Sequence, residues 1–115
     1  MIENREKLIG AGIALDEALE RFDYQNDLYE KYLLRFQEDT HMSAVKKGMA
    51  EADYDFVLRE AHAMKGLTGT LGMQDLYEAC SAVVSAVREN HTEELPGLVD
   101  DMEHQYIRIM SIYKA

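Results

Sequence analysis

A helical repeat of apolar residues between Asp53 and Gly72 constrains the fold of this chain more than any other feature. If each residue advances a helix by about 100° from Val57, four more residues fall within roughly 40° of the same direction. These residues are Ala61, Met64, Thr68 and Leu71. One long helix with a single buried stripe is therefore predicted over residues 53–71, with Gly72 as its C-terminal glycine.

The opposite face of this helix carries a histidine among small and cationic residues. His62 lies about 140° from the centre of the stripe. Around it are Lys65, Gly69 and Gly66, at about 80°, 120° and 180° on the same wheel. A glycine inside a helix costs about 1 kcal/mol relative to alanine, so two beside one histidine indicate a surface that another molecule approaches closely.

An imidazole exposed in this way offers a nucleophilic ring nitrogen near neutral pH. Lys65 stands one turn further along the helix, close to any anion that the nitrogen of His62 would carry. The residues therefore indicate reversible phosphorylation of His62. Within the stripe, we expect the hydroxyl of Thr68 to bond back to the carbonyl of Met64.

Three further apolar repeats predict the partners of this helix. They cover residues 28–42, residues 76–90 and residue 92 to the C-terminus. Residues 43–52 are predicted to form a short extra helix or a helical link. Four amphipathic helices with short connections predict an all-α fold, an antiparallel four-helix bundle.

Residues 1–22 are expected to form a short extra N-terminal helical segment, broken at Gly10 and Gly12, that covers one end of the bundle. With 115 residues, the chain can bury one core but not two, so residues 1–115 are predicted to form a single domain. One apolar stripe on each helix favours a monomer.

Composition excludes several classes of partner. A net charge of -10 would repel the phosphates of nucleic acid and of anionic membrane surfaces. No apolar run approaches the ~20 residues that span a bilayer. The single cysteine, Cys80, lies on an apolar stripe as a small buried hydrophobe and suits a reducing compartment, so we expect a cytoplasmic protein.

The sequence contains no clear pattern for a metal site or for an ATP-binding loop. A di-iron bundle needs a Glu-x-x-His pattern on each of two helices, and one such stretch exists, from Glu38 to His41. His91 and His104 have no spacing that predicts convergence on a metal. Because no glycine-rich phosphate loop is present either, neither a metal nor an ATP-dependent kinase is expected.

The stretch His62-x-x-Lys65-Gly66-x-Thr68-x-x-Leu71-Gly72 resembles the signature of histidine-containing phosphotransfer (HPt) domains of two-component phosphorelays. The resemblance covers most of the chain, from about residue 12 to residue 89. Upstream segments that are similar to the usual opening of the family are Gly12–Asp16, Ala18–Phe22, Leu28–Tyr29 and Leu33–Phe36.

The resemblance implies a phosphocarrier rather than an enzyme. A receiver domain would present its phosphoaspartate, with Mg²⁺ bound to the receiver, to His62, and Lys65 would offset the charge of the transferred group. The group would then pass to another receiver. The implied partners are response-regulator receiver domains or a hybrid sensor histidine kinase, and no cofactor is expected on this chain.

Four residues around the histidine are candidates for docking the partner. Gly66 and Gly69 would let the loops of a receiver come within reach of the imidazole, although close helix packing would also explain a glycine. Leu58, one turn before His62, and Arg59, at the far edge of the face, are the other two candidates.

One position departs from the pattern of the family. HPt domains often carry a polar residue on the following helix that steadies the active histidine, and the equivalent position here falls near Val84. Ser81 and Ser85 are the candidates to replace it.

Other functions remain open at this point. The chain is also compatible with a helical docking module that binds receivers without being phosphorylated. It is equally compatible with the phosphoacceptor domain of a chemotaxis-type histidine kinase. An enzyme using His62 as a general base would need a second titratable group, and the wheel offers only Asp55, at about 160°.

Overall fold

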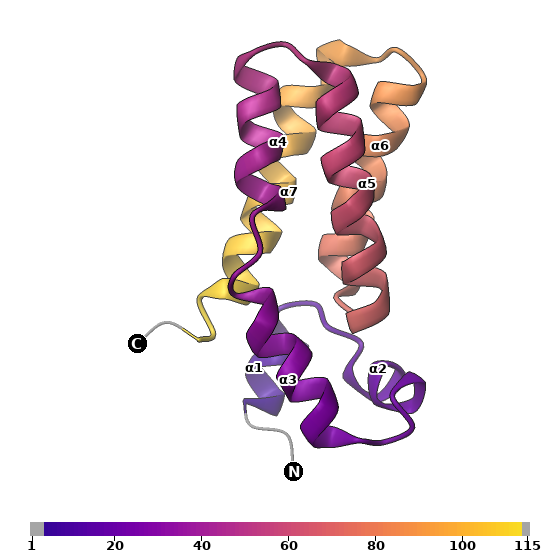
Figure 1. The fold of residues 1–115 in the computed structure, drawn as a ribbon, viewed down its shortest axis with the longest axis vertical. Coiled ribbons are helices and arrows are strands. Elements are labelled where there is room, and N and C mark those ends of the chain that lie inside the picture. The colour runs from indigo at the N-terminus through magenta and orange to yellow at the C-terminus, as the bar shows by residue number, and fades with distance from the viewer. Residues whose placement is uncertain (1–3, 114–115) are drawn as a thin grey trace.

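The computed structural model describes residues 4–113, and the regular structure in this range is helical (Figure 1). The elements in chain order are α1 (Arg5–Gly10), α2 (Leu15–Arg21), α3 (Asn26–Phe36), α4 (His41–Ala50), α5 (Tyr54–Leu71), α6 (Gln74–Arg88), a 3₁₀ turn η1 (Thr92–Glu94) and α7 (Leu95–Met110). None of the helices in this range has the length and apolar character needed to cross a membrane.

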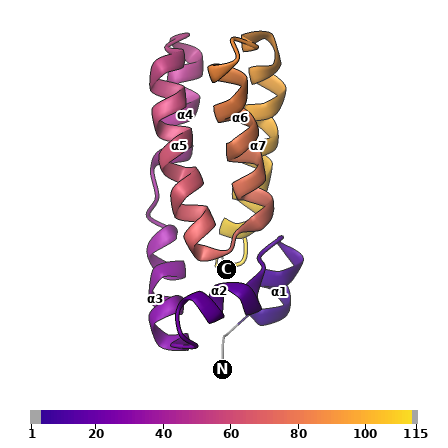
Figure 2. The ribbon, with the colours of Figure 1, turned by 90° about the vertical axis from the view of Figure 1, so that its right-hand side faces the viewer.

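Helices α4, α5, α6 and α7 stand side by side and alternate in direction, whereas α1, α2 and α3 lie at one end of them (Figures 1 and 2). The predicted all-α bundle with an extra N-terminal segment is confirmed. The prediction of which helices form the bundle is wrong for the first one. That helix is α4, and not a helix over residues 28–42.

The helix predicted over residues 28–42 is in fact two helices, and residues 43–50 belong to the bundle instead of linking it. The Asp39 carboxylate accounts for the break, because its Oδ2 accepts the backbone N–H of His41 at 2.9 Å and so satisfies a donor in the first turn of α4. After Phe36 the chain therefore turns and restarts its helix at His41.

The stripe of α5 is buried as predicted. The exposed fraction is 0% for Val57, Ala61, Met64 and Thr68 and 1% for Leu71. The expected bond of Thr68 is wrong by one residue, because its hydroxyl donates to the carbonyl of Lys65 at 3.1 Å and not to that of Met64. Cys80 is fully buried, and burial raises the pKa of its thiol to about 12.

Both ends of α5 are capped by local chemistry. The Asp53 side chain accepts the backbone N–H of Phe56 at 3.2 Å. At the other end Gly72 adopts a left-handed conformation with φ 72°, and a Cβ there would lie 2.7 Å from the Cβ of Ala18. Glycine is required at this position both for its backbone conformation and for the close approach of α2.

The N-terminal segment closes the end of the bundle where α5 turns into α6. The backbone N–H of Ala14 donates to the carbonyl of Gly72 at 2.7 Å. From α3, the buried Tyr29 hydroxyl donates to the carbonyl of Leu71 at 2.6 Å, and burial raises the pKa of this phenol. The Tyr29 bond satisfies a carbonyl in the last turn of α5, where intrahelical donors run out, and the Gly72 carbonyl accepts the N–H of Ala14 in addition to that of Gln74.

Substitution of Tyr29 by phenylalanine removes one of these bonds and leaves a buried carbonyl without its partner. We expect Tyr29→Phe to lower the free energy of unfolding by about 1–2 kcal/mol. Tyr24→Phe is the matched control, because Tyr24 is 68% exposed, and its effect should stay within about 0.5 kcal/mol. Urea denaturation followed by circular dichroism measures both, and equal stability of the two variants would contradict this role of Tyr29.

Candidate functional site

His62 lies near the middle of α5 with its side chain exposed. Burial of the stripe on the opposite side of the helix fixes this orientation. Among residues 4–113 the imidazole has neither a hydrogen bond nor an ion pair, so neither ring nitrogen is engaged by the described part of the chain.

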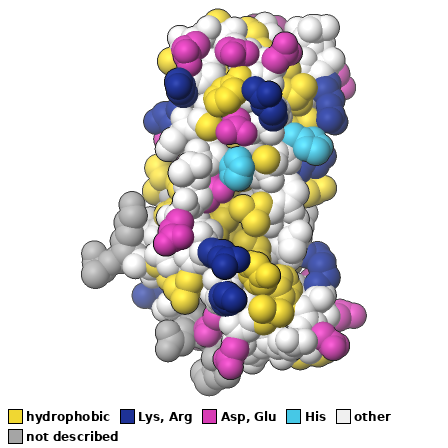
Figure 3. Space-filling view, in the orientation of Figure 1, with side chains coloured by type: hydrophobic (Ala, Val, Ile, Leu, Met, Phe, Trp, Pro, Cys, Tyr) yellow, Lys and Arg dark blue, Asp and Glu magenta, His cyan; other side chains and the backbone are white. Residues whose placement is uncertain are grey.

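A shallow hollow of ≈ 390 Å³ lies beside this imidazole. Seven residues line it: Arg21, His62, Lys65, Gly66, Gly69, Thr70 and Tyr77. Two of these side chains are cationic and none is a carboxylate, although the chain as a whole has 22 acidic residues against 12 basic ones. Such a concave, cation-lined surface attracts anions. Figure 3 shows exposed histidine side chains on one face of the molecule, together with cationic, acidic and apolar side chains on the same face.

Lys65 is held in this hollow by a neighbour on α6. Its Nζ lies 5.9 Å from the ring centroid of Tyr77, within the range of a cation–π contact. The ammonium group is therefore placed one turn along α5 from His62, where it can meet the charge of a group bound to the imidazole.

The two glycines of the site differ in what surrounds them. A Cβ added at Gly66 would meet nothing within 4 Å, so this position faces open space. A Cβ at Gly69 would lie 3.2 Å from two ring carbons of Tyr77. Packing between α5 and α6 therefore accounts in part for glycine at position 69, whereas no neighbour accounts for glycine at position 66.

The other two docking candidates border the site without lining the hollow. Leu58 is partly buried against the core. Arg59 is exposed, and its guanidinium lies 5.5 Å from the ring centroid of Phe56. Their docking role stays a prediction.

The residues considered as supports for His62 do not contact it through hydrogen bonds. Val84 is buried in the core. The Ser81 hydroxyl donates to the carbonyl of Tyr77 at 2.9 Å, and Ser85 is exposed. In the described part of the chain, the polar support common in the family has no equivalent at His62.

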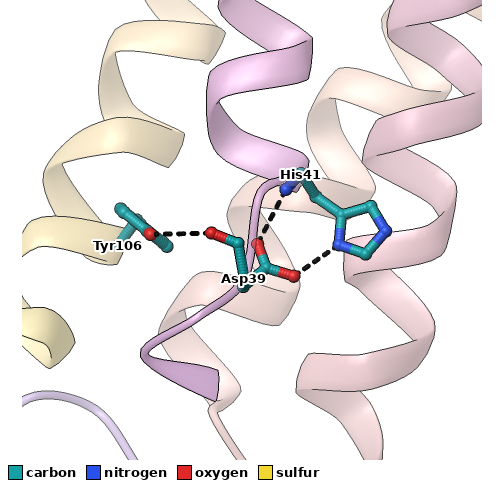
Figure 4. A network of polar contacts seen from close by, with 3 residues as sticks. All are labelled: Asp39, His41 and Tyr106. Carbon is teal, nitrogen blue, oxygen red and sulfur yellow. Dashed lines mark hydrogen bonds and ion pairs between the residues drawn. The ribbon is translucent and has the colours of Figure 1, made fainter. Parts of the chain in front are cut away.

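Two other histidines are engaged by carboxylates. The Nδ1 of His41 contacts the Asp39 carboxylate, whose side chain is 4% exposed, and the Tyr106 hydroxyl donates to the Asp39 carbonyl at 3.5 Å (Figure 4). The Nδ1 of His91 lies 3.1 Å from the Glu94 carboxylate.

His104 is exposed and without a hydrogen bond to any described residue, as His62 is. It differs in its surroundings, because Asp100 and Asp101 precede it by one turn of α7. These carboxylates would repel a phosphoryl group. Across residues 4–113, no three His, Cys, Asp or Glu side chains gather as candidate metal ligands.

Three residues of the hollow were not predicted as site residues from the sequence: Thr70, Tyr77 and Arg21. Thr70 lies on α5 itself, whereas Tyr77 comes from α6 and Arg21 from α2, so a helical wheel of residues 53–71 contains neither of these two. The Arg21 Nη1 donates to the carbonyl of Gly69 at 2.5 Å and to that of Thr70 at 3.3 Å.

Comparison with known proteins adds one finding. A family model described as Hpt domain matches residues 27–111. No curated protein and no solved structure shows significant similarity to the chain. The match spans α4 to α7 and almost all of α3, and it leaves α1 and α2 outside.

The difference between the two glycines predicts different effects of alanine. Gly66→Ala should raise the free energy of unfolding by about 0.5–1 kcal/mol, because alanine favours the helix and meets nothing. Gly69→Ala should raise the free energy of unfolding by less, since its methyl group must displace the ring of Tyr77. Urea denaturation compares the two, and an equal or larger gain at position 69 would contradict the packing described here.

Proposed function

The chain belongs to the Hpt domain family, and on this premise we propose that it is a phosphorelay carrier. It accepts a phosphoryl group on His62 from the phosphoaspartate of a receiver domain and passes it to another receiver. The observation that carries the proposal is the exposed imidazole of His62, which has no hydrogen bond or ion pair among residues 4–113 and borders a hollow lined by Lys65 and Arg21.

The transfer exchanges one bond to phosphorus for another. A ring nitrogen of neutral His62 attacks the phosphorus in line, and the bond to the aspartyl oxygen breaks with its electron pair, which regenerates the carboxylate. The imidazole then loses the proton of its other nitrogen. Mg²⁺ bound to the receiver would neutralise charge on the donor side, and this chain needs no cofactor of its own.

Lys65 acts on the acceptor side of the same step. The position of its ammonium, one turn from His62 and over the ring of Tyr77, supports a role in stabilising the charge of the phosphoryl oxygens during transfer. Gly66 supports docking, because it adds no side chain to the surface next to His62, at a position where a Cβ would meet nothing within 4 Å.

The partners proposed are receiver domains, either free or part of a hybrid sensor histidine kinase. The direction of the transfer depends on which receiver is phosphorylated, because each step is reversible. The residues of the hollow serve docking and charge stabilisation, so most of the catalytic groups belong to the receiver and the chain acts as a carrier in the cytoplasm, without nucleotide.

The first prediction concerns the site of phosphorylation. A receiver charged with acetyl phosphate and freed of excess reagent should label the wild-type chain and His104→Gln equally, and it should not label His62→Gln. The adduct should be labile in acid and stable in base, as a phosphoramidate is. Because His62 is exposed, His62→Gln should change the free energy of unfolding by less than about 0.5 kcal/mol.

Labelling of a folded His62→Gln variant would refute the proposal. Absence of labelling in the wild-type chain, with several receivers, would instead favour a docking module that binds receivers without accepting phosphate. Labelling only by an ATP-binding kinase domain would favour the phosphoacceptor domain of a chemotaxis-type kinase.

The second prediction concerns Lys65. Lys65→Gln should lower the rate of transfer at saturating receiver by about tenfold, which corresponds to about 1.4 kcal/mol of transition-state stabilisation. Lys47→Gln on the exposed surface of α4 makes the same change in net charge and should leave the rate unchanged. Rapid-quench measurements separate the two, and equal rates for both variants would show that Lys65 has no electrostatic role.

A further inference from the structure

The hollow beside His62 receives one of its two cations from outside the family match. Arg21 ends α2, six residues before the matched region begins. Its guanidinium reaches the last turn of α5, where Nη1 donates to the carbonyls of Gly69 and Thr70. The Gly69 carbonyl also accepts the backbone N–H of Gly72 at 3.3 Å. Carbonyls in the last turn of a helix carry partial negative charge, so they hold a cation well.

These bonds use only part of the guanidinium. Arginine has five N–H donors, and the hydrogen bonds found among residues 4–113 involve Nη1 alone. Nη2 and Nε thus keep donors for a further acceptor, and Arg21 is exposed. A guanidinium with free donors on Nη2 and Nε can bind a carboxylate through two parallel hydrogen bonds.

The carbonyls also fix where the charge stands. A free arginine side chain on a surface loses rotamer freedom when it binds a partner, whereas one already bonded to Gly69 and Thr70 has lost part of that freedom in advance. Gly69 lies seven positions after His62, which corresponds to about 10 Å along the axis of α5. The Arg21 guanidinium is therefore bonded about two turns of α5 beyond His62, on the hollow that a protein docking at the histidine would cover.

We propose that Arg21 is a docking residue that selects receiver domains carrying a carboxylate beside their phosphorylation site. The proposal rests on the proposed function and extends it to the N-terminal segment. Charge complementarity supports an acidic segment as the occupant, because the hollow offers Arg21 and Lys65 and no carboxylate. Arg21 acts on association with the receiver, and the chemical step proceeds at His62 without it.

Two substitutions separate the charge of Arg21 from its bonds to α5. Arg21→Gln keeps an amide donor for the carbonyls and removes the charge, whereas Arg21→Lys keeps the charge. Arg88→Gln is the matched control, because Arg88 is exposed in the last turn of α6 and its loss changes the net charge equally. The measurement is the transfer rate as a function of the concentration of acetyl-phosphate-charged receiver, at low and high salt.

We expect Arg21→Gln to raise the half-saturating receiver concentration about fivefold, as loss of one exposed charge contact would. Its rate at saturation should equal that of the wild type, and its dependence on salt should be weaker. Arg21→Lys should keep most of the affinity and the salt dependence, and Arg88→Gln should match the wild type.

Half-saturation and salt dependence of Arg21→Gln equal to those of the wild type would overturn the proposal. The proposal would also be overturned if both Arg21 variants lost transfer only in proportion to their loss of free energy of unfolding. That result would show that Arg21 has a structural role. If the wild-type chain is labelled and Arg21→Gln has the same half-saturating receiver concentration, this inference fails and the proposed function stands. A wild-type chain that no receiver labels defeats the proposed function and this inference together.

Discussion

Burial of one stripe of α5 is the constraint on which the rest of the structure depends. Because Val57, Ala61, Met64, Thr68 and Leu71 all face the core, the helix has one permitted rotation about its axis. At that rotation His62 points to solvent and Lys65 lies beside it. The orientation of the face that carries His62 is thus set by what is buried on the opposite side, and packing of α4, α6 and α7 around the stripe holds an exposed histidine in a defined place.

Hydrogen bonds at the C-terminal end of α5 both stabilise the bundle and position a charged side chain on its surface. Tyr29 and Arg21 come from α3 and α2, and both donate to carbonyls of the last turn of α5. Tyr29 does so from a buried position, where it supports only the fold. Arg21 does so from an exposed position, where the same bonds hold a charge at the rim of the hollow. Arg21, which lies outside the family match, therefore both contacts the end of the bundle and lines the hollow beside His62.

The features that the sequence predicts correctly are local ones. The period of the apolar residues, the helix start at Asp53 and the C-terminal glycine at position 72 are properties of neighbouring residues, so α5 and the exposure of His62 follow from them. The break at Asp39 depends on one side chain competing for a backbone donor, which periodicity does not detect. The wheel places Gly69 toward solvent, but it does not contain α6, whose Tyr77 covers that position. Arg21 could not be predicted for the same reason, since its place beside His62 results from how α2 packs on the end of the bundle.

The central claim is that His62 carries the phosphoryl group because no described residue bonds to its imidazole and the hollow beside it is lined by cations. Two of the other histidines are bonded to carboxylates, and His104 stands among aspartates. Peptide mapping of the wild-type chain at neutral to alkaline pH, after transfer from a phosphorylated receiver, tests the claim most directly. The account predicts one phosphoryl group in each chain, on the peptide that contains His62. A phosphoryl group on His41, His91 or His104 would contradict it.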